Sequence, residues 1–265
     1  MPRADLPGVR LHYEVEGEGP PLLLLAGMTS DGASWGPVVP ALARRFTVIR
    51  PDNRTTGRTL PADAPAGLAE WAGDAVALLD HLRLTRAHVA GHSLGGHVAL
   101  RLAATTPGRV DRLALLAAAP VAMPRNVALF RHLLSLRGEG MPPDLWLRGL
   151  FPWLFHPRLF EDGAAVDALV ARSLAYPHGQ GPEAMARQLA ALERAHATLV
   201  LPDPPPPTLA VLAADDLLLP PSVARPALAR LHARVVEVAD AGHSVHWDAP
   251  EAVAAHLLAH FAEAA

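Results

Sequence analysis

Apolar residues along this chain of 265 residues gather in short runs, separated by longer stretches with helical spacing. Continuous runs such as Leu22–Ala26 are typical of strands that are covered on both faces of a sheet. One early stretch differs, because apolar and polar residues alternate from Leu11 to Val15, with His12 and Glu14 at the polar positions; this is the period of a half-buried strand. Further strands are expected at 46–49, 87–90, 113–116, 208–212 and 235–238.

Helical spacing of the apolar residues fills most of the intervals between these strands. Val76, Leu79 and Leu82 show it within the range 69–82. We also expect helices at 38–44, 96–103 and 250–261, the last with a proline suited to its first turn. Strands that alternate with helices predict an α/β fold with a mostly parallel, doubly wound sheet flanked by helices.

One long stretch, residues 121–207, lacks the alternation. Its pattern is helical throughout and is interrupted by proline and glycine. It ends in the four prolines Pro204–Pro207, a stiff extended segment that leads back into the sheet. We therefore predict an α/β core made of residues 1–120 and 208–265, with a helical cap inserted at 121–207.

The segment Gly91-His92-Ser93-Leu94-Gly95 lies between a predicted strand and a predicted helix. This context favours a nucleophile elbow, a turn so tight that glycine is needed two residues before and after the serine. Such a turn holds the Ser93 hydroxyl at the N-terminus of the following helix, where a developing negative charge is favoured. The alternative is a glycine-rich connecting loop with no catalytic role.

A serine hydroxyl needs a general base, and the base needs an orienting acid. In folds with this elbow the acid and then the base follow the serine along the chain, each after a later strand. Asp216 follows the strand at 208–212 and is the preferred acid, with Asp215 as its competitor. His243 follows the strand at 235–238, directly after a glycine, and is the preferred base, with His246 as its competitor.

The oxyanion of such a reaction needs two backbone donors. The amide that follows the nucleophile, that of Leu94, is one candidate. The amide of Met28, in the loop after the strand at 22–26, is the other, and Gly27 lets this backbone approach closely.

Aromatic residues of the predicted cap are candidates for the wall of an apolar substrate cavity. The competing interpretation is that they pack the cap onto the core. Arg54 and Arg58 are candidates for binding a substrate carboxylate, although an internal ion pair is favoured for both. The candidate substrate-contacting residues are Gly27, Trp35, His92, Trp146, Phe151 and Trp153.

Composition narrows the classes of partner. The net charge is −3 and no basic block occurs, which argues against nucleic acid; no apolar run is long enough to cross a bilayer. The absence of cysteine excludes disulfides, thiolate metal sites and a cysteine nucleophile, and no metal site is predicted. Residues 1–7 lack the apolar core of a signal peptide, so we expect a cytoplasmic protein whose partner is a small-molecule substrate. The oligomeric state does not follow from the sequence.

Taken together with the segment 51–59, these motifs resemble those of the α/β-hydrolase superfamily over nearly the whole chain. Residues 51–59 (Pro-Asp-Asn-Arg-Thr-Thr-Gly-Arg-Thr) are similar to its Asp-x-Arg-Gly-x-Gly-x-Ser loop. The resemblance is to the serine-nucleophile, helical-cap branch that includes esterases and lactonases. It implies an eight-stranded sheet whose first strands are antiparallel, a variable cap, and chemistry without metals or cofactors.

Two departures from the family pattern stand out. Ala26 replaces a histidine found in many relatives, so a hydrogen bond from that side chain is missing while the backbone donor remains. Thr55 and Thr59 replace the usual glycine and serine of the second loop, which puts the geometry of that turn in question.

The sequence thus predicts a serine hydrolase that cleaves a carboxylic ester, lactone or thioester through an acyl-enzyme on Ser93. The same triad also serves C–C bond hydrolysis, perhydrolysis, acyl transfer or a biosynthetic cyclisation. An alternative of another class is a non-catalytic protein that binds or senses a small molecule in the same cleft.

Overall fold

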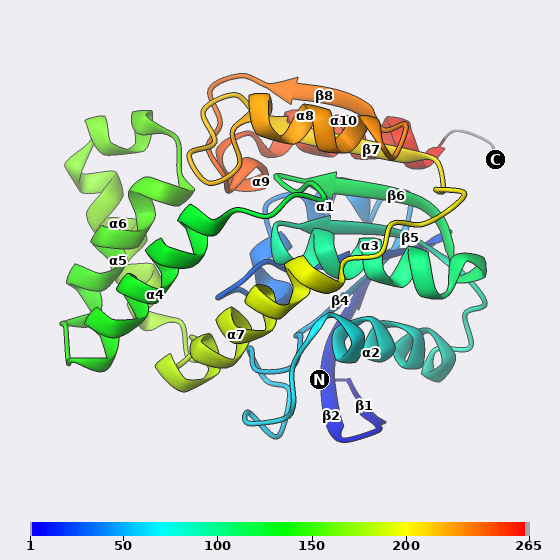
Figure 1. Cartoon of the computed structure of the whole chain (residues 1–265), viewed down its shortest axis with the longest axis horizontal. Coiled ribbons are helices and arrows are strands. Elements are labelled where there is room, and N and C mark those ends of the chain that lie inside the picture. Colours follow the sequence, from blue (N-terminus) through cyan, green and yellow to red (C-terminus); the bar gives the residue numbers. More distant parts are fainter. Residues whose placement is uncertain (1, 263–265) are drawn as a thin grey trace.

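The computed structural model describes residues 2–262, apart from the side chains of residues 196–198 (Figure 1). Its eight strands form one sheet in the order β1-β2-β4-β3-β5-β6-β7-β8. The pairs β1–β2 and β2–β4 are antiparallel and the other pairs are parallel, so the predicted fold class is confirmed. The strands are β1 (Arg3–Leu6), β2 (Val9–Glu16), β3 (Pro21–Leu25), β4 (Thr47–Pro51), β5 (Ala87–His92), β6 (Val110–Leu116), β7 (Thr208–Ala213) and β8 (Arg234–Val238).

Helices cover both faces of this sheet. In β3, Leu23 and Leu25 pack into the apolar layer shared with α2, α3 and α8, while Leu22 and Leu24 pack into the layer shared with α1 and α10. All four leucines are buried, which explains why the strand is apolar without alternation. The helices of the core are α1 (Val39–Leu42), α2 (Leu68–His81), α3 (Leu94–Thr105), α8 (Pro221–Ala229), α9 (Val245–Asp248) and α10 (Pro250–Ala262), with the 3-10 turns η1 (Gly32–Trp35) and η2 (Pro107–Arg109).

Four further helices lie between β6 and β7 and stand to one side of the sheet (Figure 1). The last of them, α7, runs back from this group to α2. They are α4 (Pro124–Gly138), α5 (Pro143–Leu154), α6 (Gly163–Ala175) and α7 (Pro182–Thr198), with the 3-10 turn η3 (Pro157–Glu161) after α5. We refer to the segment from α4 to α7 as the cap.

The strands expected from the apolar runs lie within three residues of their predicted limits. The interpretation of β2 as half-buried is wrong in detail, because His12 is fully buried whereas Val15 is 41% exposed. β2 lies inside the sheet between β1 and β4, and the hydroxyl of Thr59, in the segment that covers the strand, accepts from the His12 N–H at 3.0 Å. The strand β1 and the short helices α8 and α9 had no clear signal in the apolar pattern.

Candidate active site

The turn between β5 and α3 places Ser93 at the N-terminus of α3 with a φ of 51°. A left-handed φ is rare for a residue with a side chain and is concentrated at functional turns. A Cβ on Gly91 would lie 2.2 Å from the carbonyl oxygen of Gly95, and one on Gly95 would lie 2.1 Å from that of Leu25. Both positions therefore require glycine, as the motif predicts.

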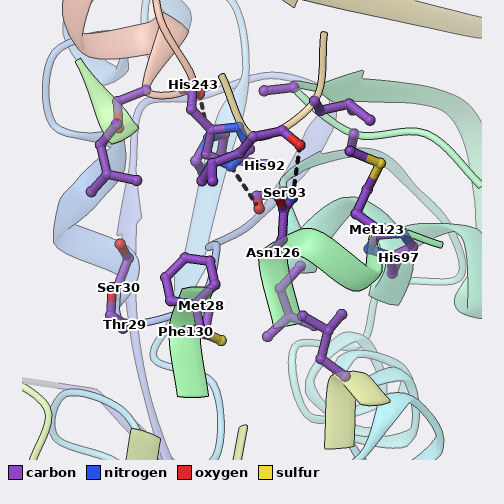
Figure 2. A pocket seen from close by; sticks show the side chains of 18 of the residues that line it. Met28, Thr29, Ser30, His92, Ser93, His97, Met123, Asn126, Phe130 and His243 are labelled. Carbon is purple, nitrogen blue, oxygen red and sulfur yellow. Dashed lines mark hydrogen bonds between the residues drawn. The ribbon is translucent and has the colours of Figure 1, made fainter. Parts of the chain in front are cut away.

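Three side chains from different loops meet at this turn. The Nε2 atom of His243 lies 2.9 Å from Ser93 Oγ, and its Nδ1 atom lies 2.9 Å from Asp216 Oδ2 (Figure 2 shows the first contact). Because an ionised carboxylate only accepts hydrogen bonds, the proton on His243 belongs on Nδ1, which leaves Nε2 to accept from the serine hydroxyl. The structure thus brings together all three residues that the sequence nominated for the triad.

Asp216 is held as an acceptor in the loop after β7. The N–H groups of Leu218 and Leu219 both donate to its Oδ1 atom at 2.8 Å. Burial by itself would raise the pKa of Asp216, but the charge and hydrogen bond of His243 and these two amides outweigh it and hold the pKa below its usual value. The competitor Asp215 has a half-exposed side chain and lies 3.3 Å from His156 of the cap.

The competing base His246 belongs to a different environment. Its ring packs 5.0 Å from that of Trp35 and 4.6 Å from that of His92, and it is 2% exposed. Burial lowers the pKa of His246 well below its usual value, so the ring is held neutral. It is a buried packing residue behind His243.

Two residues that line the cavity beside Ser93 have backbone N–H groups that are unpaired in the described part of the chain. Met28 and Leu94 both line this cavity, and within the described residues neither amide N–H has a hydrogen-bond partner. Unpaired N–H groups beside a nucleophile are the arrangement that an oxyanion requires. The two amides nominated from the sequence are therefore available for this task.

The cavity above Ser93 has a volume of about 80 Å³ and is walled mainly by apolar side chains (Figure 2). Its polar lining comes from Ser93, His243 and His92 and from a few cap and loop residues. The apolar wall consists of Met28, Leu94, Ala117, Ala118, Ala119, Val121, Met123, Phe130, Leu154, Leu192, Leu218 and Leu219, and the polar wall also includes Thr29, Ser30, His97, Asn126 and Ser244.

Four aromatic candidates for this wall lie elsewhere, so that part of the sequence interpretation is wrong. Trp35 is fully buried in the apolar layer beneath the sheet, and Phe151 packs in a separate cluster inside the cap. Trp146 is buried within the cap, where its Nε1–H donates to the Leu133 carbonyl at 2.8 Å. Trp153 packs against the same cap cluster. Aromatic composition indicates burial here, but not which surface each ring covers.

The remaining two candidate substrate-contacting residues, Gly27 and His92, lie close together in the structure. Gly27 does not line the cavity; a Cβ there would lie 2.8 Å from His92 Nδ1, so glycine lets the loop after β3 pass over this ring. His92 does line the cavity, and its Nε2–H donates to the carbonyl of His243 at 2.9 Å. Burial lowers the pKa of His92 to about 3, which keeps the ring neutral. His92 therefore braces the backbone of His243.

Both arginines considered for substrate binding are used inside the protein. Arg54 pairs with Asp74 through two contacts of 2.6 and 2.8 Å. Arg58 pairs with Asp52 at 3.0 Å and with Glu14 at 2.9 Å. The internal ion pairs favoured from the sequence are present.

One supporting residue was missed by the sequence analysis. Asp248 Oδ2 accepts from the N–H groups of Gly242 and His156 at 2.8 and 2.9 Å, which joins the loop of His243 to the end of the cap helix α5. Nothing in the spacing of these residues signals the contact, because it depends on how the cap docks.

No cluster of three or more histidine, aspartate or glutamate side chains suited to a metal ion occurs in the described part of the chain. Over the same residues, no helix has the length and apolar character needed to cross a membrane.

Comparison with known proteins places the chain in a family. The model described as "Alpha/beta hydrolase family" matches residues 22–256, which is most of the sequence. The chain belongs to the alpha/beta hydrolase family. The resemblance seen in the motifs is thereby confirmed.

Individual relatives agree with this assignment. The protein named "Putative carbamate hydrolase RutD" from Azorhizobium caulinodans is 33% identical over 224 residues, which cover 83% of this chain and 82% of the relative. The structure of a thermophilic esterase from Thermogutta terrifontis matches with a TM-score of 0.83 at 26% identity over 98% of both chains. That of an enol-lactonase from Burkholderia xenovorans LB400 matches with a TM-score of 0.82 at 26% identity, over 99% of this chain and 100% of the lactonase. The protein is therefore a hydrolase of the alpha/beta family.

Proposed function

We propose that the protein is a serine hydrolase that cleaves a small carboxylic ester, lactone or thioester through an acyl-enzyme on Ser93. The observation that carries this proposal is the continuous line from Asp216 through His243 to the Ser93 hydroxyl, with contacts of 2.9 Å at both steps. This line ends in a cavity lined by Met28 and Leu94, whose backbone N–H groups have no hydrogen-bond partner among the described residues. A non-catalytic binding protein has no need of this geometry.

The reaction follows from the contacts. His243 Nε2 takes the proton of Ser93 as Oγ attacks the substrate carbonyl, and Asp216 stabilises the imidazolium that forms. The N–H groups of Met28 and Leu94 bind the oxyanion of the tetrahedral intermediate. His243 then gives its proton to the leaving group, and the same base activates a water molecule that releases the acid from Ser93.

The cavity limits the size of the substrate. A volume of about 80 Å³ holds about six water molecules, since each needs roughly 10–15 Å³. The mostly apolar wall favours an acyl group of a few carbons without charge. We expect longer acyl chains to displace cap side chains that line the cavity, such as Phe130 and Leu154.

A carbamate is a second candidate substrate, because the similarity to RutD extends over more than four fifths of this chain. A carbamate carbonyl is attacked in the same way, with nitrogen on the acyl side. The other triad reactions, C–C bond hydrolysis, perhydrolysis, acyl transfer and cyclisation, differ in their products and are separated by a product assay.

The test is a panel of nitrophenyl esters with acyl chains of increasing length, small lactones, a thioester and a carbamate. We expect the highest kcat/KM for the shortest acyl chains. Ser93→Ala should lower kcat by about 10⁴-fold or more, as expected when a nucleophile that acts with its base is lost. The control Ser135→Ala changes an exposed serine on α4 and should match the wild type. Equal turnover by Ser93→Ala would reject the proposal, and tight binding of these compounds without turnover by the wild type would favour the binding protein.

A further inference from the structure

The cap forms hydrogen bonds with the loop that carries Met28. We call residues 27–31 the oxyanion loop; it follows β3 and forms one side of the cavity above Ser93. Two cap side chains, Tyr176 after α6 and Gln188 on α7, form hydrogen bonds with it from more than 140 residues away in sequence. We call this pair the cap clamp.

Gln188 makes the inner contact of the clamp. Its side chain is fully buried, and its Oε1 atom accepts from the N–H of Thr29 at 3.0 Å. An N–H group requires an acceptor, so the amide must face Thr29 with its oxygen. The Nε2 atom is then left buried without a hydrogen-bond partner among the described residues. A buried polar atom left in this state is costly, which indicates that the oxygen contact is the one that matters.

Tyr176 makes the outer contact. Its hydroxyl donates to Asp31 Oδ2 at 2.6 Å, and the other oxygen of Asp31 accepts from the N–H of Ala33 at the start of η1. The two contacts of the clamp therefore hold the oxyanion loop at Thr29 and at Asp31, on the far side of Met28 from β3.

The backbone between these points is under strain. Thr29 has a φ of 62°, a left-handed conformation that a β-branched residue adopts only when its surroundings impose it. Among the described residues, the one backbone hydrogen bond that joins two residues of this loop is a long one, from Ser30 N–H to the Gly27 carbonyl at 3.4 Å. The peptide between Met28 and Thr29 thus depends on Gln188 for its orientation.

The Thr29 contact also decides which amide is free. Because Thr29 N–H is taken up by Gln188, it does not compete with Met28 for the oxyanion. Among the described residues the Met28 N–H stays unpaired, and Met28 lines the cavity together with Leu94. If Gln188 lost its acceptor, the peptide between Met28 and Thr29 would lose this restraint, and the adjoining peptide between Gly27 and Met28, which carries the Met28 N–H, would lose its support on that side.

We propose that Gln188 is a positioning residue, which orients the Met28 N–H for the oxyanion by accepting from Thr29, so that the cap helix α7 is part of the oxyanion hole. This inference rests on the proposed serine hydrolase function. The cap then does more than enclose the substrate: the hole has its working shape only when α7 is docked on the core. Gln188 itself does not line the cavity above Ser93.

The experiment compares Gln188→Met, which keeps the length of the side chain without the acceptor, with Gln188→Glu, which keeps an acceptor oxygen. Burial favours the neutral form of the new carboxyl, and either form still accepts from Thr29. Arg187→Met is the matched control, because Arg187 is the exposed neighbour on the same helix. For each variant we measure kcat and KM per Ser93 labelled by a fluorophosphonate, the inhibition constant of a small boronic acid that mimics the tetrahedral intermediate, and the melting temperature.

We expect Gln188→Met to lower kcat by about 10- to 100-fold, since a misplaced oxyanion donor costs part of what a missing one does. KM should stay within about twofold, and boronic acid affinity should fall in parallel with kcat. Gln188→Glu should restore most of kcat, and Arg187→Met should match the wild type. Tyr176→Phe, which removes the outer contact, should show a smaller fall of the same kind and serves if Gln188→Met does not fold.

The inference would be overturned if Gln188→Met kept the kcat and the boronic acid affinity of the wild type. It would also be overturned if Gln188→Met and Gln188→Glu lost kcat equally and in proportion to their fall in melting temperature. If Gln188→Met does not fold, wild-type kcat in Tyr176→Phe would overturn it as well. These outcomes are distinct from failure of the proposed function, which is shown by full activity in Ser93→Ala.

Discussion

The contact between His92 and the backbone of His243 gives a prediction whose size follows from the structure. The His92 Nε2–H is the one hydrogen-bond partner of the His243 carbonyl among the described residues, at 2.9 Å in a buried setting. His92→Phe keeps an aromatic ring of similar size on the nucleophile turn but removes this donor. The carbonyl of the catalytic histidine is then left buried and unpaired.

An unpaired buried carbonyl costs about 1–3 kcal/mol, so we take about 2 kcal/mol as the loss of unfolding free energy. For a chain of this size that corresponds to a fall in melting temperature of about 4–8 °C. Because the same bond fixes the backbone of His243, kcat should also fall, by about 10-fold, through poorer alignment of Nε2 with Ser93.

The assay is thermal unfolding by calorimetry together with kcat on the best ester of the panel. The control is His88→Phe, earlier on the same strand, where the ring stacks 5.0 Å from Phe261 and its buried Nδ1 atom has no partner among the described residues. This control removes a histidine without removing a hydrogen bond and should leave the melting temperature within about 2 °C. Equal stability and kcat in His92→Phe and His88→Phe would refute the role given to His92.

Three further predictions concern the elbow, the acid and the cavity. Gly95→Ala should lower the unfolding free energy, measured by urea denaturation, by about 3 kcal/mol or more, because its Cβ would lie 2.1 Å from the Leu25 carbonyl oxygen. The control Gly108→Ala, with open space around the added Cβ, should be neutral, and equal stability of the two variants would contradict the elbow geometry. Because the pKa of Asp216 is lowered in the folded protein, its ionised form stabilises the fold above about pH 4, and this contribution is lost as the pH falls through the lowered pKa. The loss of unfolding free energy in Asp216→Asn should therefore be present at pH 7 and shrink below about pH 4. A loss that does not change with pH would count against the assignment of Asp216. Phe130→Ala should open the cap wall of the cavity and raise kcat/KM for longer acyl chains relative to acetate, and an unchanged chain-length profile would show that Phe130 does not limit the acyl group.

Local patterns carried most of what the sequence predicted correctly. The turn at Ser93 is specified by its own neighbours, because glycine is required at 91 and 95 wherever the elbow forms. Asp216 and His243 each follow a parallel strand directly, and in a parallel sheet such loops gather at one edge. The triad was therefore readable before its distances were known.

The cap shows where the sequence signal ends. Trp146 and Phe151 are buried, as expected for aromatic side chains, but they pack against other residues of the cap clusters and do not line the cavity. The contact of Gln188 with Thr29 joins residues 159 positions apart, and a glutamine on a helix carries no local sign of it. Such contacts depend on how one layer docks on another, which neither spacing nor periodicity reports.

The central claim is that Ser93 carries the acyl group during turnover. The most direct measurement is mass spectrometry of the protein quenched in acid during reaction with nitrophenyl acetate, followed by peptide mapping. We predict the added mass of one acetyl group on the peptide that contains Ser93, and no such adduct in Ser93→Ala. An acetyl group on another residue, with Ser93→Ala still turning over the ester, would contradict the account.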